Sequence, residues 1–286
     1  MRALITGSTG LLGGWLVREA RAAFEDVTAV GGPSSGIDLA DLGVATRLFE
    51  RAKPDVIVHG AALSAIADCA REPDRARRSN VEVTRTLASL AAATQARFVH
   101  VSTDLVFGGE AAPYREDAPG DPTSVYGRTK LEAEPIARSV EDSVVARVAL
   151  LFGPTRTKRR GFFDMQTEAL RDGAAVRLFD DEWRTPLSLM AAAESLVAIA
   201  RSSLRGIVHL GGPERMSRLE MGARLARVLR ASPAGIVATS RTAVAGEPRP
   251  KDVSLDRALL ERTFPGLARA SFEDECARMM RVPPEG

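Results

Sequence analysis

Cysteine is scarce in this 286-residue chain, which contains only Cys69 and Cys276. Two cysteines do not make a disulfide framework, and neither has a nearby Cys or His at metal-ligand spacing, so we predict no metal site. Cys276 falls in a helical apolar stripe, which predicts a core position. Long apolar runs are also missing, because no stretch is long enough to span a bilayer and no signal peptide precedes the first predicted strand. We therefore expect a cytoplasmic protein that does not bind membranes.

A strong excess of one charge is absent as well. The formal net charge is +2, and residues of both signs are spread along the chain. This distribution does not indicate a nucleic-acid partner. With 45% hydrophobic and 27% charged residues, the composition excludes disordered and fibrous classes and is typical of a soluble enzyme. The length allows one large domain, or a domain with a smaller lobe.

Tyrosine and lysine are rare, yet one of each lies four residues apart. The chain has two tyrosines and four lysines, among them Tyr126 and Lys130. On a helix, this spacing puts the phenol and the ammonium on one face. A neighbouring cation favours the phenolate and lowers the tyrosine pKa, which suits the side chain for proton transfer. The same spacing is also typical of a solvated helix face, so other motifs must distinguish the two interpretations.

The glycine-rich turn near the start of the chain has the pattern of a phosphate-binding turn. A β-branched run at residues 2–6 stops at Gly7, and Gly10 and Gly13 follow before an apolar helical pattern. Glycines permit a tight turn and let backbone N–H groups approach a pyrophosphate at the positive end of the helix. The alternative is an ordinary strand–helix turn. The position at the start of the chain favours dinucleotide binding.

The second predicted strand, residues 27–30, ends without the acidic residue that NAD sites usually have there. No arginine follows it either, so Ser34, Ser35 and exposed backbone are the candidates for binding a 2′-phosphate. NADP(H) is therefore favoured over NAD(H). Asp38 could accept a hydrogen bond from the adenine amino group, or it could cap the following helix.

Strands alternate with helical patterns, which predicts an α/β fold with a Rossmann-type doubly wound parallel sheet. We expect a dinucleotide-binding domain of residues 1–151 with about 187–210. The remaining residues, 152–186 and 211–286, are expected to form a smaller C-terminal substrate-binding lobe. Pro135 should kink or end the helix that carries the rare tyrosine.

Polar and small residues at strand ends indicate where a ligand binds. Ser102, Thr103 and Asp104 follow an apolar strand, and small residues at 60–62 follow another. The carboxyl ends of parallel strands are where open α/β sheets bind ligands. His59 and His100 belong to these apolar runs and are interpreted as structural. A basic run within residues 155–161 is interpreted as a solvated loop, with contact to an anionic substrate as the alternative.

The glycine turn, Thr103, Tyr126 and Lys130, in this order, resemble an extended short-chain dehydrogenase/reductase. Two stretches are similar to that family and two to its dTDP-4-dehydrorhamnose reductase branch, and together they extend the resemblance over nearly the whole chain. They are S-T-D-x-V-F-G (residues 102–108) and Y-G-x-x-K-x-x-x-E (126–134) for the family, and L-G-G-P-E-R-x-S (210–217) and G-E-P-R-P-x-x-x-S-L-D (246–256) for the branch.

The resemblance implies a role for each matching residue. Tyr126 would protonate the reduced carbonyl, and Lys130 would hold the nicotinamide ribose and lower the Tyr126 pKa. Thr103 would hydrogen-bond the carbonyl, Asp104 would help to position the sugar, and Asn80 would order the active-site helix. The other implied cofactor-binding residues are Gly7, Gly10, Leu11 and Leu12 at the pyrophosphate, Asp38 and Leu39 at the adenine, Ala61, Ala62 and Leu63 along the cofactor, and Ser102 near the nicotinamide.

The implied activity is NAD(P)H-dependent reduction of the 4-keto group of a nucleotide-linked 6-deoxy sugar, as in dTDP-rhamnose biosynthesis. Leu150 stands where rhamnose-forming relatives carry a tryptophan, and residues 181–186 only approximate the branch pattern, so the sugar and the base stay open.

Two alternatives to this reductase remain. One is a nucleotide-sugar epimerase or dehydratase, which would keep its cofactor tightly bound. The other is a non-catalytic NADP-binding regulatory subunit, since the same branch includes a regulatory subunit of methionine adenosyltransferase. The oligomeric state is open as well, with a homodimer as the candidate assembly.

Overall fold

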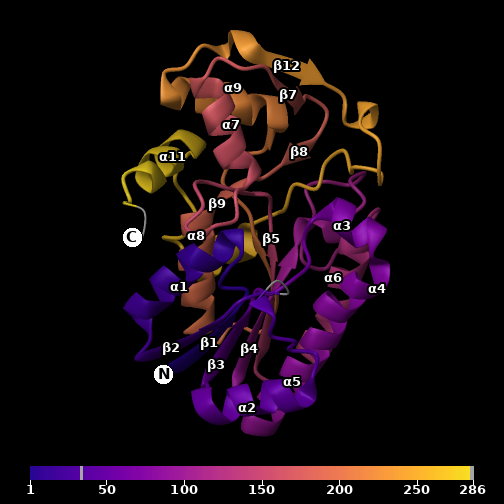
Figure 1. The fold of residues 1–286 in the computed structure, drawn as a ribbon, viewed down its shortest axis with the longest axis vertical. Coiled ribbons are helices and arrows are strands. Elements are labelled where there is room, and N and C mark those ends of the chain that lie inside the picture. Colours follow the sequence, from indigo (N-terminus) through magenta and orange to yellow (C-terminus); the bar gives the residue numbers. More distant parts are fainter. Residues whose placement is uncertain (33–34, 284–286) are drawn as a thin grey trace.

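The computed structural model describes residues 1–32 and 35–283, and its central feature is a six-stranded parallel sheet (Figure 1). The strand order is β10–β5–β4–β3–β1–β2. The strands are β1 (Arg2–Thr6), β2 (Asp26–Val30), β3 (Val56–His59), β4 (Arg97–Thr103), β5 (Ser143–Val148) and β10 (Gly206–Leu210). Because β2 and β3 lie on opposite sides of β1, the chain changes direction there, and such a switch point is where open sheets bind ligands. The predicted Rossmann-type doubly wound sheet is confirmed.

Both faces of the sheet are buried, because successive side chains of each strand point to opposite sides. In β1, Ala3 and Ile5 face one apolar core, whereas Leu4 faces the other. The first core is covered by α1 (Leu11–Ala23) and α8 (Leu189–Ala200). The second is covered by α2 (Leu42–Ala52), α5 (Val83–Thr94) and α6 (Val125–Arg138). Helices on both sides explain the near-continuous apolar strands of the sequence.

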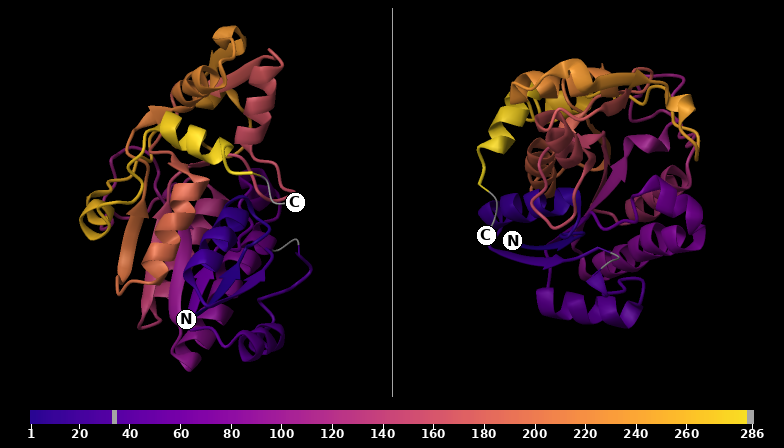
Figure 2. Two further views of the ribbon diagram at one scale, coloured as in Figure 1. Left: turned by 90° about the vertical axis from the view of Figure 1, so that its left-hand side faces the viewer. Right: turned by 45° about the horizontal axis from the view of Figure 1, so that its top comes forward.

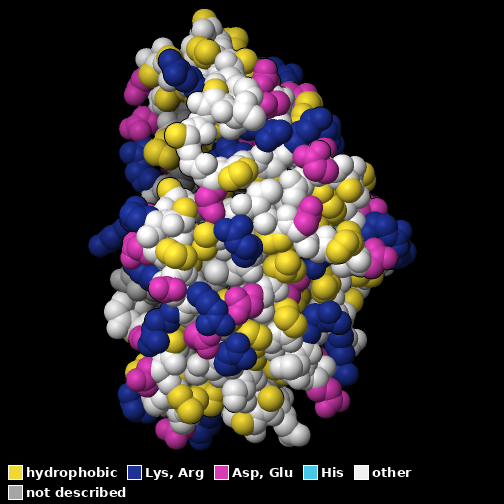
Figure 3. All heavy atoms as spheres, turned by 90° about the vertical axis from the view of Figure 1, so that its right-hand side faces the viewer, with side chains coloured by type: hydrophobic (Ala, Val, Ile, Leu, Met, Phe, Trp, Pro, Cys, Tyr) yellow, Lys and Arg dark blue, Asp and Glu magenta, His cyan; other side chains and the backbone are white. Residues whose placement is uncertain are grey.

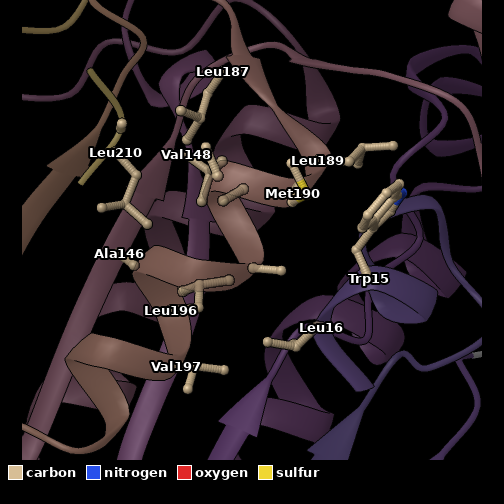
Figure 4. Close-up of a cluster of buried hydrophobic side chains, with 14 of the residues drawn as sticks. Trp15, Leu16, Ala146, Val148, Leu187, Leu189, Met190, Leu196, Val197 and Leu210 are labelled. Atoms are coloured by element: carbon tan, nitrogen blue, oxygen red, sulfur yellow. The ribbon is translucent and has the colours of Figure 1, made fainter. Parts of the chain in front are cut away.

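Helix α8 packs beside α1 on the same face of the sheet, and Figure 4 shows the side chains at this contact. Trp15 and Leu16 of α1 lie opposite Met190, Leu196 and Val197 of α8. Because α8 is covered on nearly every side, it is apolar all round, as expected of a helix in the core of a protein. This contact fixes α1, and therefore the glycine turn that precedes it, against the sheet.

Smaller sheets and helices stand over the carboxyl ends of the central strands (Figures 1 and 2). They are β7 (Val176–Phe179) with β12 (Ile236–Thr239), β8 (Trp183–Arg184) with β11 (Met216–Ser217), β6 (Leu151–Phe152) with β9 (Leu187–Ser188), and α7 (Phe162–Arg171), α9 (Arg218–Leu229) and α11 (Phe272–Met280). The other short elements are α3 (Ile66–Arg71), α4 (Pro73–Arg77), α10 (Ala258–Thr263), the π-helical turn η2 (Arg78–Glu82), and the 3₁₀ turns η3 (Asp104–Val106), η4 (Pro233–Gly235) and η5 (Arg241–Ala243). The division into the two sequence-defined domains stays a prediction.

Several local expectations can be compared with the structure. Cys276 is completely buried, as predicted. Pro135 was expected to kink or end its helix, and it does not end it, since α6 continues to Arg138. A proline removes a single N–H donor, and one missing hydrogen bond close to the end of a helix does not stop it.

The outer surface shows no segregation of charge on the face drawn in Figure 3, where basic and acidic side chains are interspersed. Within the described residues, no helix is long and apolar enough to cross a membrane. The same residues contain no cluster of three or more His, Cys, Asp or Glu side chains arranged to hold a metal ion.

Candidate active site

The glycine turn between β1 and α1 has the close backbone approach that its sequence predicts. Gly7 has a φ of +84°, and a Cβ there would lie 2.6 Å from the carbonyl carbon of Gly60. A Cβ on Gly13 would collide with the carbonyl oxygen of Gly7. Gly10 precedes α1 and offers no side-chain cap, so the first N–H groups of the helix, including those of Leu11 and Leu12, are left for a ligand. This donor set and the lack of side chains fit the pyrophosphate of a dinucleotide.

Substitution of Gly13 by Ala is expected to lower the free energy of unfolding by about 1–3 kcal/mol, because the added methyl must displace backbone atoms. Gly13→Ala should also weaken dinucleotide binding, since the displaced atoms belong to the turn. Urea unfolding and NADP⁺ titration measure the two effects. Gly32→Ala is the control, because a Cβ at Gly32 meets no atom within 4 Å. Equal stability of the two variants would contradict the packing argument.

The residues predicted along the cofactor lie at the end of β3, beside the glycine turn. Ala61 is buried, and its N–H donates to Thr6 Oγ1 at 3.2 Å. Leu63 is held by the Asn80 side chain, which accepts from the Leu63 N–H at 2.8 Å and donates to its carbonyl at 3.1 Å. Ala62 lies between them and is half-buried.

Asp38 is exposed and forms an ion pair with Arg78 at 2.5 Å. This guanidinium holds the Asp38 pKa below its usual value, against the opposing effect of burial. The alternative that Asp38 caps α2 is wrong, because Asp41 accepts from the Val44 N–H at 2.9 Å instead. Leu39 is buried, and the adenine role of both residues stays a prediction.

The predicted 2′-phosphate candidates are only partly covered by the structure. Ser34 lies outside the described residues, whereas the Ser35 N–H donates to the carbonyl of Gly32 at 2.9 Å. No arginine directly follows β2 in the sequence, but η2 supplies Arg78 at the neighbouring Asp38. No local pattern signals this contact, because the two residues are 40 positions apart.

The structure brings Thr103, Tyr126 and Asp104 together at the carboxyl end of β4. The Ser124 hydroxyl caps α6 by accepting from the Gly127 N–H at 3.1 Å. Gly127 packs directly on the carbonyl of Leu105, so the first turn of α6 lies close to the end of β4. Thr103 hydrogen-bonds Asp104 Oδ1 at 3.2 Å, and its hydroxyl also interacts with Tyr126.

The pKa of Tyr126 is raised rather than lowered in the protein alone. Burial is the largest cause and the Asp104 carboxylate the second, while the Thr103 hydroxyl and the Arg159 charge lower the pKa to a smaller extent. The predicted lowering by Lys130 is therefore not observed in this state. The phenol remains protonated at neutral pH, which suits a proton donor.

Lys130 lies beneath Tyr126 on the same helix, with 2% of its surface exposed. Its Nζ is 3.2 Å from His100 Nε2. Burial lowers the Lys130 pKa to about 8, against an opposing effect of Glu134. Burial also lowers the His100 pKa well below its ordinary value, so this imidazole is neutral and can accept from the ammonium. The sequence favours a structural role for His100, and the structure places its imidazole in contact with the lysine.

Asn80 connects α6 to the end of β3. In addition to its two bonds with Leu63, its Nδ2 donates to Thr129 Oγ1 at 2.9 Å, and that hydroxyl donates to the carbonyl of Tyr126 at 2.8 Å. Asn80 is completely buried. A single amide therefore couples the strand end expected to lie along the cofactor to the backbone of the tyrosine.

Ser102 faces away from the predicted nicotinamide end. Its hydroxyl donates to Glu134 Oε1 at 2.6 Å, and Glu134 forms a buried ion pair with Arg147 at 2.7 Å. Only the backbone of Ser102 remains for a cofactor contact. The buried pair joins β5 to α6 and therefore stabilises the position of the helix that carries Tyr126 and Lys130.

Asp104 is buried and is held by groups from two distant segments. Its Oδ2 accepts from the Leu150 N–H at 3.2 Å and lies 3.8 Å from Arg184 Nε of β8. Burial raises the Asp104 pKa to about 6, while Arg184 opposes this shift. Glu182 extends the network, because it pairs with Arg184 at 3.4 Å and with Arg249 at 2.6 Å. Sequence reasoning gave none of these three residues a role, although Glu182 and Arg184 lie in the departing stretch 181–186 and Arg249 lies in the stretch 246–256.

The chain is similar in sequence to known proteins over most of its length. The family model described as the RmlD substrate binding domain matches residues 1–282. Methionine adenosyltransferase 2 subunit beta of Xenopus tropicalis is 30% identical over 285 residues, covering 91% of this chain and 82% of that protein. A probable dTDP-4,6-dihydroxy-2-methyloxan-3-one 4-ketoreductase of Streptomyces antibioticus is 32% identical over 247 residues, covering 85% and 82%.

Among solved structures, dTDP-4-dehydrorhamnose reductase of Bacillus anthracis in complex with NADP superposes with a TM-score of 0.89. The superposition covers 98% of each chain at 21% sequence identity and therefore establishes that the two proteins have a similar fold.

Proposed function

The chain belongs to the RmlD substrate binding domain family, in the dTDP-4-dehydrorhamnose reductase branch of the extended short-chain dehydrogenases/reductases, and we propose that it is an NAD(P)H-dependent ketoreductase. The substrate we propose is a nucleotide-linked 4-keto-6-deoxy sugar, with NADP(H) favoured over NAD(H). One observation carries the proposal: Thr103, Asp104 and Tyr126 meet at the carboxyl end of β4, and the buried Lys130 lies one turn further along the helix of the tyrosine.

The reaction divides between the cofactor and this chain. The nicotinamide supplies a hydride to the keto carbon when it is bound. Tyr126 donates its phenolic proton to the carbonyl oxygen, so the ketone becomes a secondary alcohol and the tyrosine a phenolate. Thr103 donates a hydrogen bond to the same oxygen, and the Lys130 ammonium stabilises the phenolate until solvent returns the proton.

The direct test measures the loss of reduced-cofactor absorbance when purified protein is mixed with dTDP-4-dehydro-L-rhamnose. NADPH and NADH are run in parallel, and the ratio of the two rates tests the cofactor preference. Rapid oxidation supports the reductase. A nucleotide-sugar epimerase or dehydratase would instead retain cofactor through purification and convert its substrate without added NAD(P)H.

A second function is favoured by the similarity to subunit beta of methionine adenosyltransferase 2. Such a protein would bind NADP and a partner enzyme without oxidising a keto sugar. NADP⁺ binding without substrate-dependent oxidation, together with co-purification of a methionine adenosyltransferase, would favour this function over the reductase.

His100 is expected to set the pH range in which Lys130 acts. Replacement by Leu removes the acceptor 3.2 Å from Nζ, so the ammonium loses a partner and its pKa falls further. The alkaline decline of kcat/KM should therefore move to lower pH in His100→Leu, whereas His100→Gln, which keeps an acceptor oxygen, should restore it. A purely structural role would lower thermal stability in both variants and leave the pH profile unchanged.

A further inference from the structure

Residues 153–161 form a basic loop between β6 and α7 that the proposed reaction does not use. The loop contains Arg156, Lys158, Arg159 and Arg160. Its base is fixed by Asp164 of α7, whose carboxylate accepts from the Thr155 N–H at 3.2 Å and from the Gly161 N–H at 2.8 Å. The charged part of the loop is therefore held in place at both ends.

The loop passes over the first turn of α1, the turn whose N–H groups fit a pyrophosphate. Trp15 Nε1 donates to the carbonyl of Pro154 at 2.9 Å. A Cβ on Gly14 would lie 2.9 Å from Arg156 Cβ, and one on Gly161 would lie 3.2 Å from a methyl carbon of Leu11. Residues 157–160 therefore arch from one contact on α1 to another, around the N-terminal end of that helix.

The four cations of the loop divide into two groups. Arg156 lies over the Trp15 ring at 5.0 Å, and Arg160 forms an ion pair with Glu168 of α7 at 2.5 Å. Lys158 and Arg159 are exposed. Among residues 1–32 and 35–283, no hydrogen bond or ion pair joins either of these two side chains. Two positive charges at the end of α1 are thus uncompensated.

The loop also reaches the tyrosine. Burial and Asp104 dominate the raised pKa of Tyr126, and the Arg159 charge is among the smaller contributions that lower it. Arg159 therefore lies within electrostatic range of the phenol, while its neighbours in the loop contact Leu11 and Gly14. The loop extends from the glycine turn toward the position where the proposed reaction takes place.

We propose that Lys158 and Arg159 form a diphosphate clamp, which binds the diphosphate of an anionic ligand held between the glycine turn and Tyr126. The inference rests on the proposed function in one respect: the dinucleotide cofactor and the nucleotide sugar each carry a diphosphate. Guanidinium and ammonium groups make strong charge-assisted hydrogen bonds to phosphate oxygens, and a loop fixed at both ends loses little freedom when it binds.

The clamp is tested by neutralising each cation in the full-length protein. Titration calorimetry with NADP⁺ and, separately, with dTDP is carried out on Lys158→Gln and Arg159→Gln at two salt concentrations. We expect about a tenfold rise in Kd for one of the two ligands and a weaker dependence of that Kd on salt. If only the affinity for NADP⁺ falls, the clamp binds the diphosphate of the cofactor. If only the affinity for dTDP falls, it binds the diphosphate of the sugar nucleotide.

Arg160→Gln is the matched control, because its side chain belongs to the same loop but pairs with Glu168. It should leave both affinities within about twofold, as expected for a surface ion pair. The clamp is overturned if Lys158→Gln and Arg159→Gln leave both Kd values unchanged, or if Arg160→Gln weakens binding equally. Since binding is measured without turnover, a protein that fails to reduce a keto sugar still tests the clamp.

Discussion

Tyr126→Phe is expected to lower kcat/KM for keto-sugar reduction by about a thousandfold, within the range typical of a lost general acid. The phenol is the proton donor that the geometry supports, and phenylalanine keeps the ring but cannot donate. Steady-state assays with the keto sugar measure the loss, and NADP⁺ titration should show an affinity within about twofold of the parent, because the ring still occupies its place.

The chain provides a control in its other tyrosine. The Tyr114 hydroxyl accepts from the N–H groups of Gly109 and Ala111, both at 3.0 Å, and its ring stacks on Phe107. Tyr114→Phe leaves two backbone donors without this acceptor, of which the Gly109 N–H is buried, and should cost about 1–3 kcal/mol of stability with little effect on kcat. If the folded Tyr126→Phe protein kept most of its turnover, the proton donor would have to be another group.

The sequence alone predicted those features of the fold and the site that depend on neighbouring residues in the chain. Gly7, Gly10 and Gly13 predicted the turn, because backbone approach to a phosphate requires residues without side chains in a fixed order. Apolar runs predicted strands buried on both faces, and the four-residue interval correctly put Tyr126 and Lys130 on one helix. Each of these patterns is complete within about a dozen residues.

The parts that could not be predicted all depend on contacts between distant segments. Arg184 reaches Asp104 from a strand 80 positions later, and Arg78 reaches Asp38 across 40 positions. His100 and Lys130 meet because β4 and α6 pack together, so neither local pattern indicated the pair. Nor does spacing reveal burial, which is why the pKa of Tyr126 was expected to be lowered and is in fact raised.

Because Lys130 is buried, we expect a rise in pH to lower activity but to increase the stability contributed by this residue. Its pKa of about 8 in the folded protein lies below the ordinary value of 10.5, so the ammonium is largely lost by pH 9. Activity that needs the cation should therefore decline above pH 8. The unfolded chain keeps its proton up to the ordinary pKa and binds more protons than the folded protein across this window, so this lysine makes the protein more stable as pH rises. If activity declines at alkaline pH because Lys130 loses its proton, the decline is therefore not caused by unfolding that this deprotonation brings about.

Lys130→Met is expected to lower kcat by about a hundredfold, the effect typical of removing one group that stabilises developing charge. Methionine fills a similar volume and needs no buried partner for a charge, so the unfolding midpoint should not fall. The remaining activity should be flat above pH 8, where the parent declines, and Lys53→Met, at an exposed lysine that ends α2, should behave as the parent. Persistence of the alkaline decline in Lys130→Met would assign it to another group and remove Lys130 from the proton-transfer step.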